Sequence, residues 1–284
     1  MKPKIDNKLH FISLGCPKNL VDSEVMLAKL IERGFTLTDD PHVAHVIVVN
    51  TCAFIEDART EAVDTILEMS QFKKNGVCKM LVVTGCMPQR YKGELSKLLP
   101  EVDVFIGAGD FPKIDKIISS FCGEQIVEVN KSQYLYDHKT SRLHTTPKHI
   151  GYIKIAEGCF HPCSFCVIPK IRGSYRSRDL GSVVSEAKKM ISNGVREINL
   201  IAQDSTAYGR DNKSNIVELM GKLSKLSGPK WIRLFYVYPH NFPDALLDVI
   251  ADSDDICRYI DMPIQHISDK ILKSMQRRGN SSEI

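Results

Sequence analysis

Three cysteines, Cys159, Cys163 and Cys166, stand within one short loop of the sequence. Their CxxxCxxC spacing allows three thiolates to fold around a single iron–sulfur cluster. Three ligands leave one iron of a four-iron cube without a protein ligand, and an open position is what a metal centre needs to bind a small molecule. The alternative is a structural zinc site with His161 as fourth ligand, but His161 lies inside the same cramped loop. The spacing therefore favours a four-iron cluster with one open iron.

A second set of cysteines, Cys16, Cys52 and Cys86, is spread along the chain, and each residue follows a short apolar run typical of a strand. Because parallel strands gather their following loops along one sheet edge, we expect these three thiols to converge on a second cluster. The alternative is three buried cysteines that pack as small apolar side chains. The remaining cysteines, Cys78, Cys122 and Cys257, fit neither set, and we expect them to be structural.

The cellular setting also favours metal chemistry over disulfides. The segment 1–9 is charged and polar, with no apolar stretch of an export signal behind it, so we expect a cytoplasmic protein whose nine cysteines are reduced. No run approaches the roughly 18 to 20 apolar residues of a membrane span. Hydrophobic residues at 43% and charged residues at 25% exclude a mostly disordered chain.

The elements that must position these cysteines alternate between strands and helices, which predicts an α/β fold. We expect an N-terminal domain over 1–130, a Rossmann-like parallel sheet covered by helices on both faces. Its strands are predicted at 9–14, 45–49, 80–84, 102–106 and 126–129, and its helices at 19–33, 57–70, 89–99 and 111–121. The polar, aperiodic stretch 131–149 is predicted to be a linker.

The alternation restarts in a second domain, expected over 150–284. Strands are predicted at 152–156, 197–202, 232–236 and 258–261, and helices at 180–192, 215–227, 243–251 and 268–276. Four such units predict a partial (β/α) barrel with its chemistry at the carboxyl ends of the strands. Because four units do not close a barrel, we expect the chain to be truncated at its C-terminus.

Charge is unevenly distributed, since the formal net charge is +4 but the stretch 142–178 alone carries +6. A local positive field of this kind favours an anionic ligand or partner, and the alternative is a solvated basic face.

The CxxxCxxC loop, with Phe165 just before the last cysteine, resembles the signature of radical S-adenosylmethionine (SAM) enzymes. The longer stretch 159–178 is similar to the methylthiotransferase family, in which three further cysteines, matched by Cys16, Cys52 and Cys86, hold an auxiliary cluster. Segments 13–24, 200–209 and 259–266 resemble the branch that modifies a ribosomal protein, and Pro17 stands where the MiaB-type tRNA branch usually has Gln. Full-length members complete the barrel and add a TRAM domain, both absent here.

This resemblance implies two 4Fe-4S clusters and SAM as cofactors. An electron from the first cluster would cleave SAM, and the resulting 5′-deoxyadenosyl radical would remove the β-hydrogen of an aspartate in the twelfth small-subunit ribosomal protein. The second cluster would hold the sulfide, and a second SAM would supply the methyl group. The implied partners are that ribosomal protein and a reductant protein such as flavodoxin or ferredoxin.

Several further residues are candidates for contacts with SAM. We expect Phe165, Val167 and Ile168 to pack against the adenine, and Gln203 and Asp204 to meet SAM at a strand end. Weaker candidates are Gln265 and His266, together with Arg172, Arg176 and Arg178, which would bind the SAM carboxylate or the ribosomal partner.

Three rival functions remain open from the sequence. A tRNA (adenosine) methylthiotransferase fits the basic stretch, although no aromatic stripe for stacking bases accompanies it. A non-catalytic iron–sulfur or zinc protein would neither bind nor cleave SAM. An inactive fragment would fold its N-terminal domain only.

Overall fold

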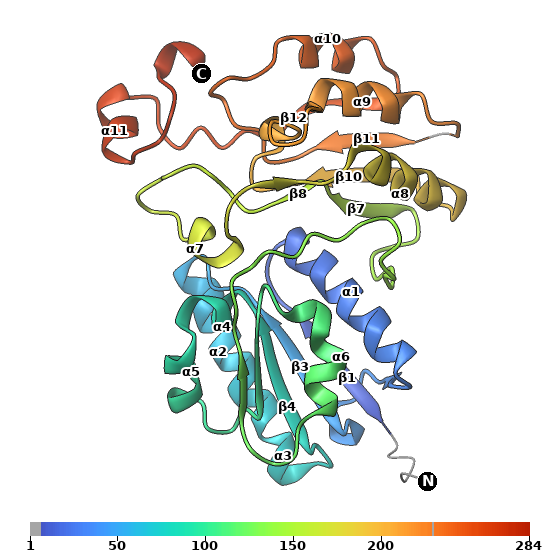
Figure 1. Ribbon diagram of the computed structural model, residues 1–284, viewed down its shortest axis with the longest axis vertical. Coiled ribbons are helices and arrows are strands. Elements are labelled where there is room, and N and C mark those ends of the chain that lie inside the picture. The colour runs from blue at the N-terminus through green and yellow to red at the C-terminus, as the bar shows by residue number, and fades with distance from the viewer. Residues whose placement is uncertain (1–6, 229) are drawn as a thin grey trace. The chain divides into compact units, whose positions relative to one another are not determined.

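A computed structural model describes residues 7–228 and 230–284 and divides them into two compact units (Figure 1). The first unit comprises residues up to 134 together with 141–143, and the second comprises 135–140 and 144–284. The stretch expected to be a linker is thus shared between the two units. We expect no export signal in the segment 1–9, and residues 1–6 of that segment lie outside the described residues.

The first unit is built on a parallel sheet of six strands in the order β2-β1-β3-β4-β5-β6, as its apolar runs predict. The strands are β1 (Lys8–Ser13), β2 (Thr36–Leu37), β3 (Val46–Thr51), β4 (Met80–Gly85), β5 (Val104–Gly107) and β6 (Ile126–Glu128). From β1 the chain places β2 on one side, whereas β3 and the strands after it lie on the other side, so the strand order reverses between β1 and β3. Such a switch point opens a crevice at the carboxyl ends of the strands.

Helices cover both faces of this sheet (Figure 1). They are α1 (Pro17–Glu32), α2 (Glu56–Ser70), α3 (Phe72–Asn75), α4 (Cys86–Tyr91), α5 (Gly93–Leu98) and α6 (Ile114–Ser119), with short 3-10 turns η1 (Pro41–Val43) and η2 (Phe111–Lys113). Successive β3 side chains point to opposite faces, so Val48 packs with Leu30 of α1 and Ile117 of α6 in one core cluster. The helix predicted over 89–99 is instead two helices, because Lys92 takes a left-handed backbone with φ of 46°.

The second unit holds a parallel sheet of four strands in the order β12-β11-β10-β7, which confirms four βα units of a partial barrel. The strands are β7 (Ile150–Lys154), β10 (Glu197–Ile201), β11 (Trp231–Leu234) and β12 (Ile256–Ile260), and the main helices are α8 (Leu180–Ser192), α9 (Ile216–Ser224), α10 (Ala245–Ala251) and α11 (Asp269–Ser274). Buried side chains such as Ile153, Val183, Leu200 and Leu219 form its core. Within the described ranges, no helix combines the length and apolarity needed to cross a membrane.

Four short elements of this unit escape the sequence patterns, namely α7 (Ile168–Arg172), β8 (Ala156–Glu157), β9 (Arg176–Ser177) and the 3-10 turn η3 (Ser205–Ala207). A further 3-10 turn, η4 (Ser281–Glu283), follows α11. The antiparallel pair β8–β9 joins Glu157 to Arg176 and so closes the base of the cysteine loop. The two ends of the loop are therefore held together by this short antiparallel pair.

Candidate functional site

The CxxxCxxC loop begins where β8 ends, and its backbone holds the three cysteines together. The Cys159 amide donates to the Gly173 carbonyl over 3.1 Å, and the Cys166 amide donates to the Cys163 carbonyl over 3.0 Å. Cys163 is buried, while Cys159 and Cys166 are partly exposed. The three thiols thus come from one short loop, and two of them are partly accessible to solvent.

The three thiols also lie within electrostatic reach of one another. Burial raises the pKa of Cys159 to about 11, and the charges of Cys163 and Cys166 add to this effect, whereas a hydrogen bond from the His161 amide lowers it. Burial likewise raises the pKa of Cys166. Clustered soft thiols that repel as thiolates are the donor set that iron ions stabilise. The loop therefore fits an iron–sulfur cluster.

His161, the alternative zinc ligand, is directed toward the barrel strands. Its Nε2 lies 2.7 Å from Oδ2 of the buried Asp204, and its ring stacks on Tyr238 with centroids 3.9 Å apart. The Nε2 atom is thus already engaged, and His161 ties the cysteine loop to the end of β10. Asp204, predicted to meet SAM, also accepts from the amides of Thr206 and Ala207.

A buried ionic group lies immediately before the loop. Glu157 accepts from Lys154 Nζ at 2.5 Å and from Gln203 Nε2 at 3.0 Å, and Arg172 Nη1 lies 3.6 Å from the same carboxylate. Burial by itself would raise the pKa of Glu157, but the charges of Lys154 and Arg172 bring it down to about 2. Glu157 is therefore an anion that fixes two cations beside the candidate cluster.

The predicted SAM contacts occupy different environments. Gln203 follows β10, and its Oε1 is buried with no partner among the described residues, which fits a polar ligand. Phe165 is 44% exposed, while Val167 and Ile168 are partly buried at the start of α7. Gln265 is exposed in the loop after β12. His266, a weaker candidate, accepts through Nδ1 from the Ser268 amide if that nitrogen carries no proton, and so braces its own loop.

The second cysteine set lies along the carboxyl edge of the first sheet. Cys52 directly follows β3 and Cys86 directly follows β4, and Cys16 caps α1 just after β1. These three strands are neighbours, and the crevice between β1 and β3 separates Cys16 from Cys52. The β1 and β3 ends come close: a Cβ atom added to Gly15 would lie 3.2 Å from Cys52 Sγ. Cys16 is the N-cap residue of the 16-residue helix α1.

Neither set has the geometry of a site for one metal ion. Across residues 7–228 and 230–284, no three His, Cys, Asp or Glu side chains gather around a single ion position. A cluster distributes its thiolates over separate irons, so its ligands stand farther apart than those of a lone zinc ion.

More than half of the basic side chains in the stretch 142–178 lie in internal ion pairs, so the positive surface field is weaker than the sequence predicts. Arg142 pairs with Glu24 at 2.5 Å and Arg178 with Glu186 at 2.5 Å, and both basic side chains are at most 9% exposed. Lys154 and Arg172 are buried against Glu157. Four of the seven basic side chains thus serve internal ion pairs, because their acidic partners are brought in by tertiary packing.

The cysteines outside both sets differ sharply in accessibility, which predicts their reactivity. Cys122 is exposed, whereas Cys78 is 6% exposed and burial, with the nearby charge of Asp103, raises its pKa. Because the thiolate is the nucleophile, we expect iodoacetamide to alkylate Cys78 at least about tenfold more slowly than Cys122. Mass spectrometry after a short pulse measures this ratio. Equal rates would contradict the burial of Cys78, and a urea-unfolded sample provides the control.

Comparison with known proteins finds relatives of both parts of the chain. Residues 8–107 match the model of the family described as "Uncharacterized protein family UPF0004", and residues 153–284 match that of the radical SAM superfamily. The chain is 47% identical to a protein of Geotalea uraniireducens and 48% identical to one of Geobacter sulfurreducens, both called ribosomal protein uS12 methylthiotransferase RimO. These alignments cover 100% and 98% of the chain but 64% and 63% of the two relatives.

Solved structures show the same fold at low identity. The radical SAM methyltransferase TsrM from Kitasatospora setae, solved with cobalamin and a [4Fe-4S] cluster, matches 98% of the chain and 66% of its own length with a TM-score of 0.66 at 13% identity. The cobalamin-dependent SAM radical enzyme OxsB matches 98% of the chain and 46% of its own length with a TM-score of 0.63 at 11% identity. The fold of the chain therefore also occurs in solved structures of low sequence identity.

Proposed function

Because the chain belongs to the radical SAM methylthiotransferase family, we propose that it carries the cluster-binding part of an enzyme that methylthiolates ribosomal protein uS12. We place the reaction at the β-carbon of an aspartate of that protein. The chain spans about two thirds of the length of its curated relatives, which bear this activity in their names. The observation that carries the proposal is the presence of two three-cysteine sets, one at the carboxyl ends of the parallel strands β1, β3 and β4 and one in the loop that β8 and β9 close.

In this proposal Cys159, Cys163 and Cys166 hold one four-iron cluster, and Cys16, Cys52 and Cys86 hold the other. When bound, the first cluster supplies the electron that divides SAM, and the second provides an iron to which sulfur attaches. The chain's own residues supply position and charge. Gln203, whose buried Oε1 has no partner among the described residues, is the best-placed polar group to accept from a SAM amino group. The Gln203 Nε2 donates to Glu157, and this hydrogen bond fixes the orientation of the Gln203 side chain.

Iron and acid-labile sulfide, counted per chain after anaerobic reconstitution, test both sites. We expect about eight irons in the unaltered chain and about four in a triple variant with Cys159, Cys163 and Cys166 changed to Ala. The complementary triple variant at Cys16, Cys52 and Cys86 is expected to retain about four as well. Cys122→Ala, an exposed cysteine outside both sets, is the matched control and keeps the full count. Zinc in place of iron would refute the proposal.

The substrate is tested separately with reduced, cluster-loaded chain, SAM and purified uS12. The expected product is uS12 with one methylthio group replacing a hydrogen, located on an aspartate by peptide fragmentation. A parallel incubation with tRNA examines the related nucleic-acid substrate, and a methylthiolated nucleoside there without modified uS12 would overturn the assignment. The pairing of Arg142, Lys154 and Arg178 with carboxylates favours the protein substrate, since these three cations are not available to phosphates.

A further inference from the structure

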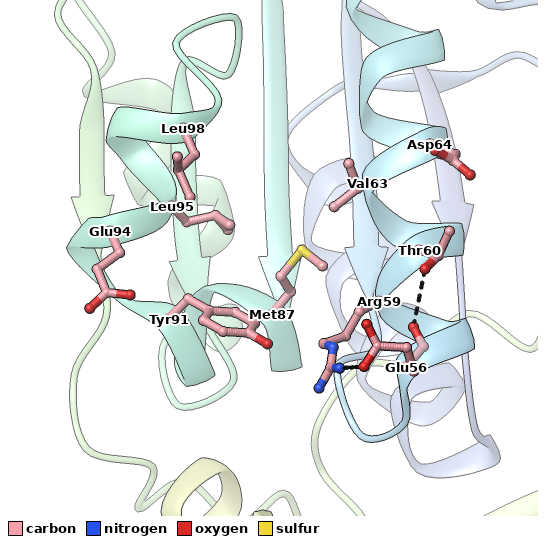
Figure 2. Close-up of a pocket in the computed structure, with 10 residues that line it drawn as sticks. All are labelled: Glu56, Arg59, Thr60, Val63, Asp64, Met87, Tyr91, Glu94, Leu95 and Leu98. Atoms are coloured by element: carbon pink, nitrogen blue, oxygen red, sulfur yellow. Dashed lines mark hydrogen bonds and ion pairs between the residues drawn. The ribbon is translucent and has the colours of Figure 1, made fainter.

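The first unit contains an open groove between α2 on one side and α4 and α5 on the other (Figure 2). Its volume is about 370 Å³, and its floor is apolar, formed by Val63, Met87, Tyr91 and Leu95. Leu98 lies at one end of the groove with 75% of its surface exposed. Leu98 and the apolar floor together form a contiguous apolar surface, the kind of surface that marks interaction sites.

The rim of this groove is acidic. Glu56, Asp64 and Glu94 line it, and the one basic lining residue, Arg59, already pairs with Glu56. The side-chain carboxylates of Asp64 and Glu94 have no hydrogen bond or ion pair with any residue that the structure describes. The α2 sequence as a whole carries a net charge of −4. The groove therefore combines an apolar floor with carboxylates that are available to an incoming cation.

One end of the groove adjoins the candidate auxiliary site. Met87 directly follows Cys86, and Glu56 lies four residues after Cys52. In Figure 2, Met87, Tyr91 and Glu56 lie toward one end of the groove, and Asp64 and Leu98 toward the other. A chain segment bound along the groove would thus be held beside the edge that carries two of the three cysteines.

We propose that this groove docks a positively charged segment of the protein substrate, with an apolar side chain on the floor and Lys or Arg side chains at Asp64 and Glu94. The proposal rests on the proposed function, in which the substrate is a ribosomal protein. Proteins that bind RNA carry Lys and Arg to neutralise phosphates, so a ribosomal protein matches an acidic rim in charge. Charge complementarity at a rim steers the partner and sets its register, while the apolar contact slows its release.

The test compares two charge reversals of equal size on the full chain. The groove variant is Asp64→Lys with Glu94→Lys, and the matched control is Asp57→Lys with Glu68→Lys, two exposed acids of α2 outside the groove. Fluorescence anisotropy with labelled uS12 measures Kd at low and at physiological salt. We expect Kd to rise at least about tenfold in the groove variant and about twofold or less in the control. Leu98→Ser, which changes no charge, is expected to raise Kd about threefold.

Each other outcome is decisive. If both charge reversals weaken uS12 binding equally, the negative charge of the whole surface attracts uS12 and the docking site is overturned. An unchanged Kd in the groove variant overturns it as well. Self-association in sedimentation that Leu98→Ser abolishes would assign the groove to a second copy instead. Because the binding assay needs neither iron nor SAM, the two proposals fail separately. Groove-dependent binding without methylthiolation refutes the activity, and groove-independent binding refutes only the docking site.

Discussion

Glu157→Gln is expected to destabilise the second unit by about 3–5 kcal/mol, the cost of removing one partner from a buried ion pair. The carboxylate is 3% exposed and is shared by Lys154 at 2.5 Å and Arg172 at 3.6 Å. Glutamine preserves the shape of the side chain and the contact to Gln203, but it leaves both buried cations without this negative charge. The loss arises mainly from the desolvation of those cations, which the carboxylate offsets in the unaltered protein.

The measurement uses Trp231, the only tryptophan of the chain, which begins β11 and therefore reports on the second unit. Urea unfolding followed by its fluorescence gives the free energy of unfolding. The matched control is Glu218→Gln, which breaks the exposed Glu218–Lys222 pair of 2.9 Å on α9, with an expected loss of about 0.5 kcal/mol or less. Comparable losses of unfolding free energy in the two variants would show that burial does not determine how much the Glu157 ion pairs stabilise the second unit.

The regular elements are the part of this fold that sequence periodicity predicts well. α8 begins and ends at the predicted residues, and the strands β1, β4 and β10 lie within about one residue of their predicted ranges. Two-residue strands such as β8 and β9 carry no periodic signal, because pairing across the cysteine loop creates them. The sequence around Lys92 does not predict its left-handed backbone, because this conformation is unusual for a residue with a side chain.

In the candidate site, too, local sequence predicts some features and not others. The positions of the six cysteines relative to strands follow from local sequence, since the end of an apolar run marks the sheet edge. Charge pairing does not follow: Glu24 and Arg142 are 118 positions apart, and only the folded chain brings them to 2.5 Å. For the same reason the sequence does not predict that Asp204, a candidate SAM contact after β10, is hydrogen-bonded to His161 and to the turn η3.

Gly85→Ala is expected to destabilise the first unit by about 3–5 kcal/mol and to remove the iron bound at the second cysteine set. Gly85 has a φ of 96°, and an added Cβ would lie 2.3 Å from Asn50 Oδ1 and 2.7 Å from the Thr51 carbonyl oxygen. Asn50 is fully buried, and its Nδ2 donates to the Asn19 carbonyl at 3.0 Å and to Ser23 Oγ at 2.8 Å. The methyl group therefore has to displace a hydrogen-bonded side chain next to Thr51 and Cys52.

Gly34→Ala separates this clash from the cost of backbone strain alone. Gly34 has nearly the same φ, 92°, but an added Cβ meets nothing within 4 Å, so we expect a loss of about 1–2 kcal/mol and no change in iron content. Hydrogen exchange of peptides covering β3 and β4 measures both variants in the first unit itself, which contains no tryptophan among its residues. Equal protection in the two variants would mean that Asn50 moves aside at little cost. The close packing of β3 against β4 would then not be what holds Cys52 and Cys86 at the sheet edge.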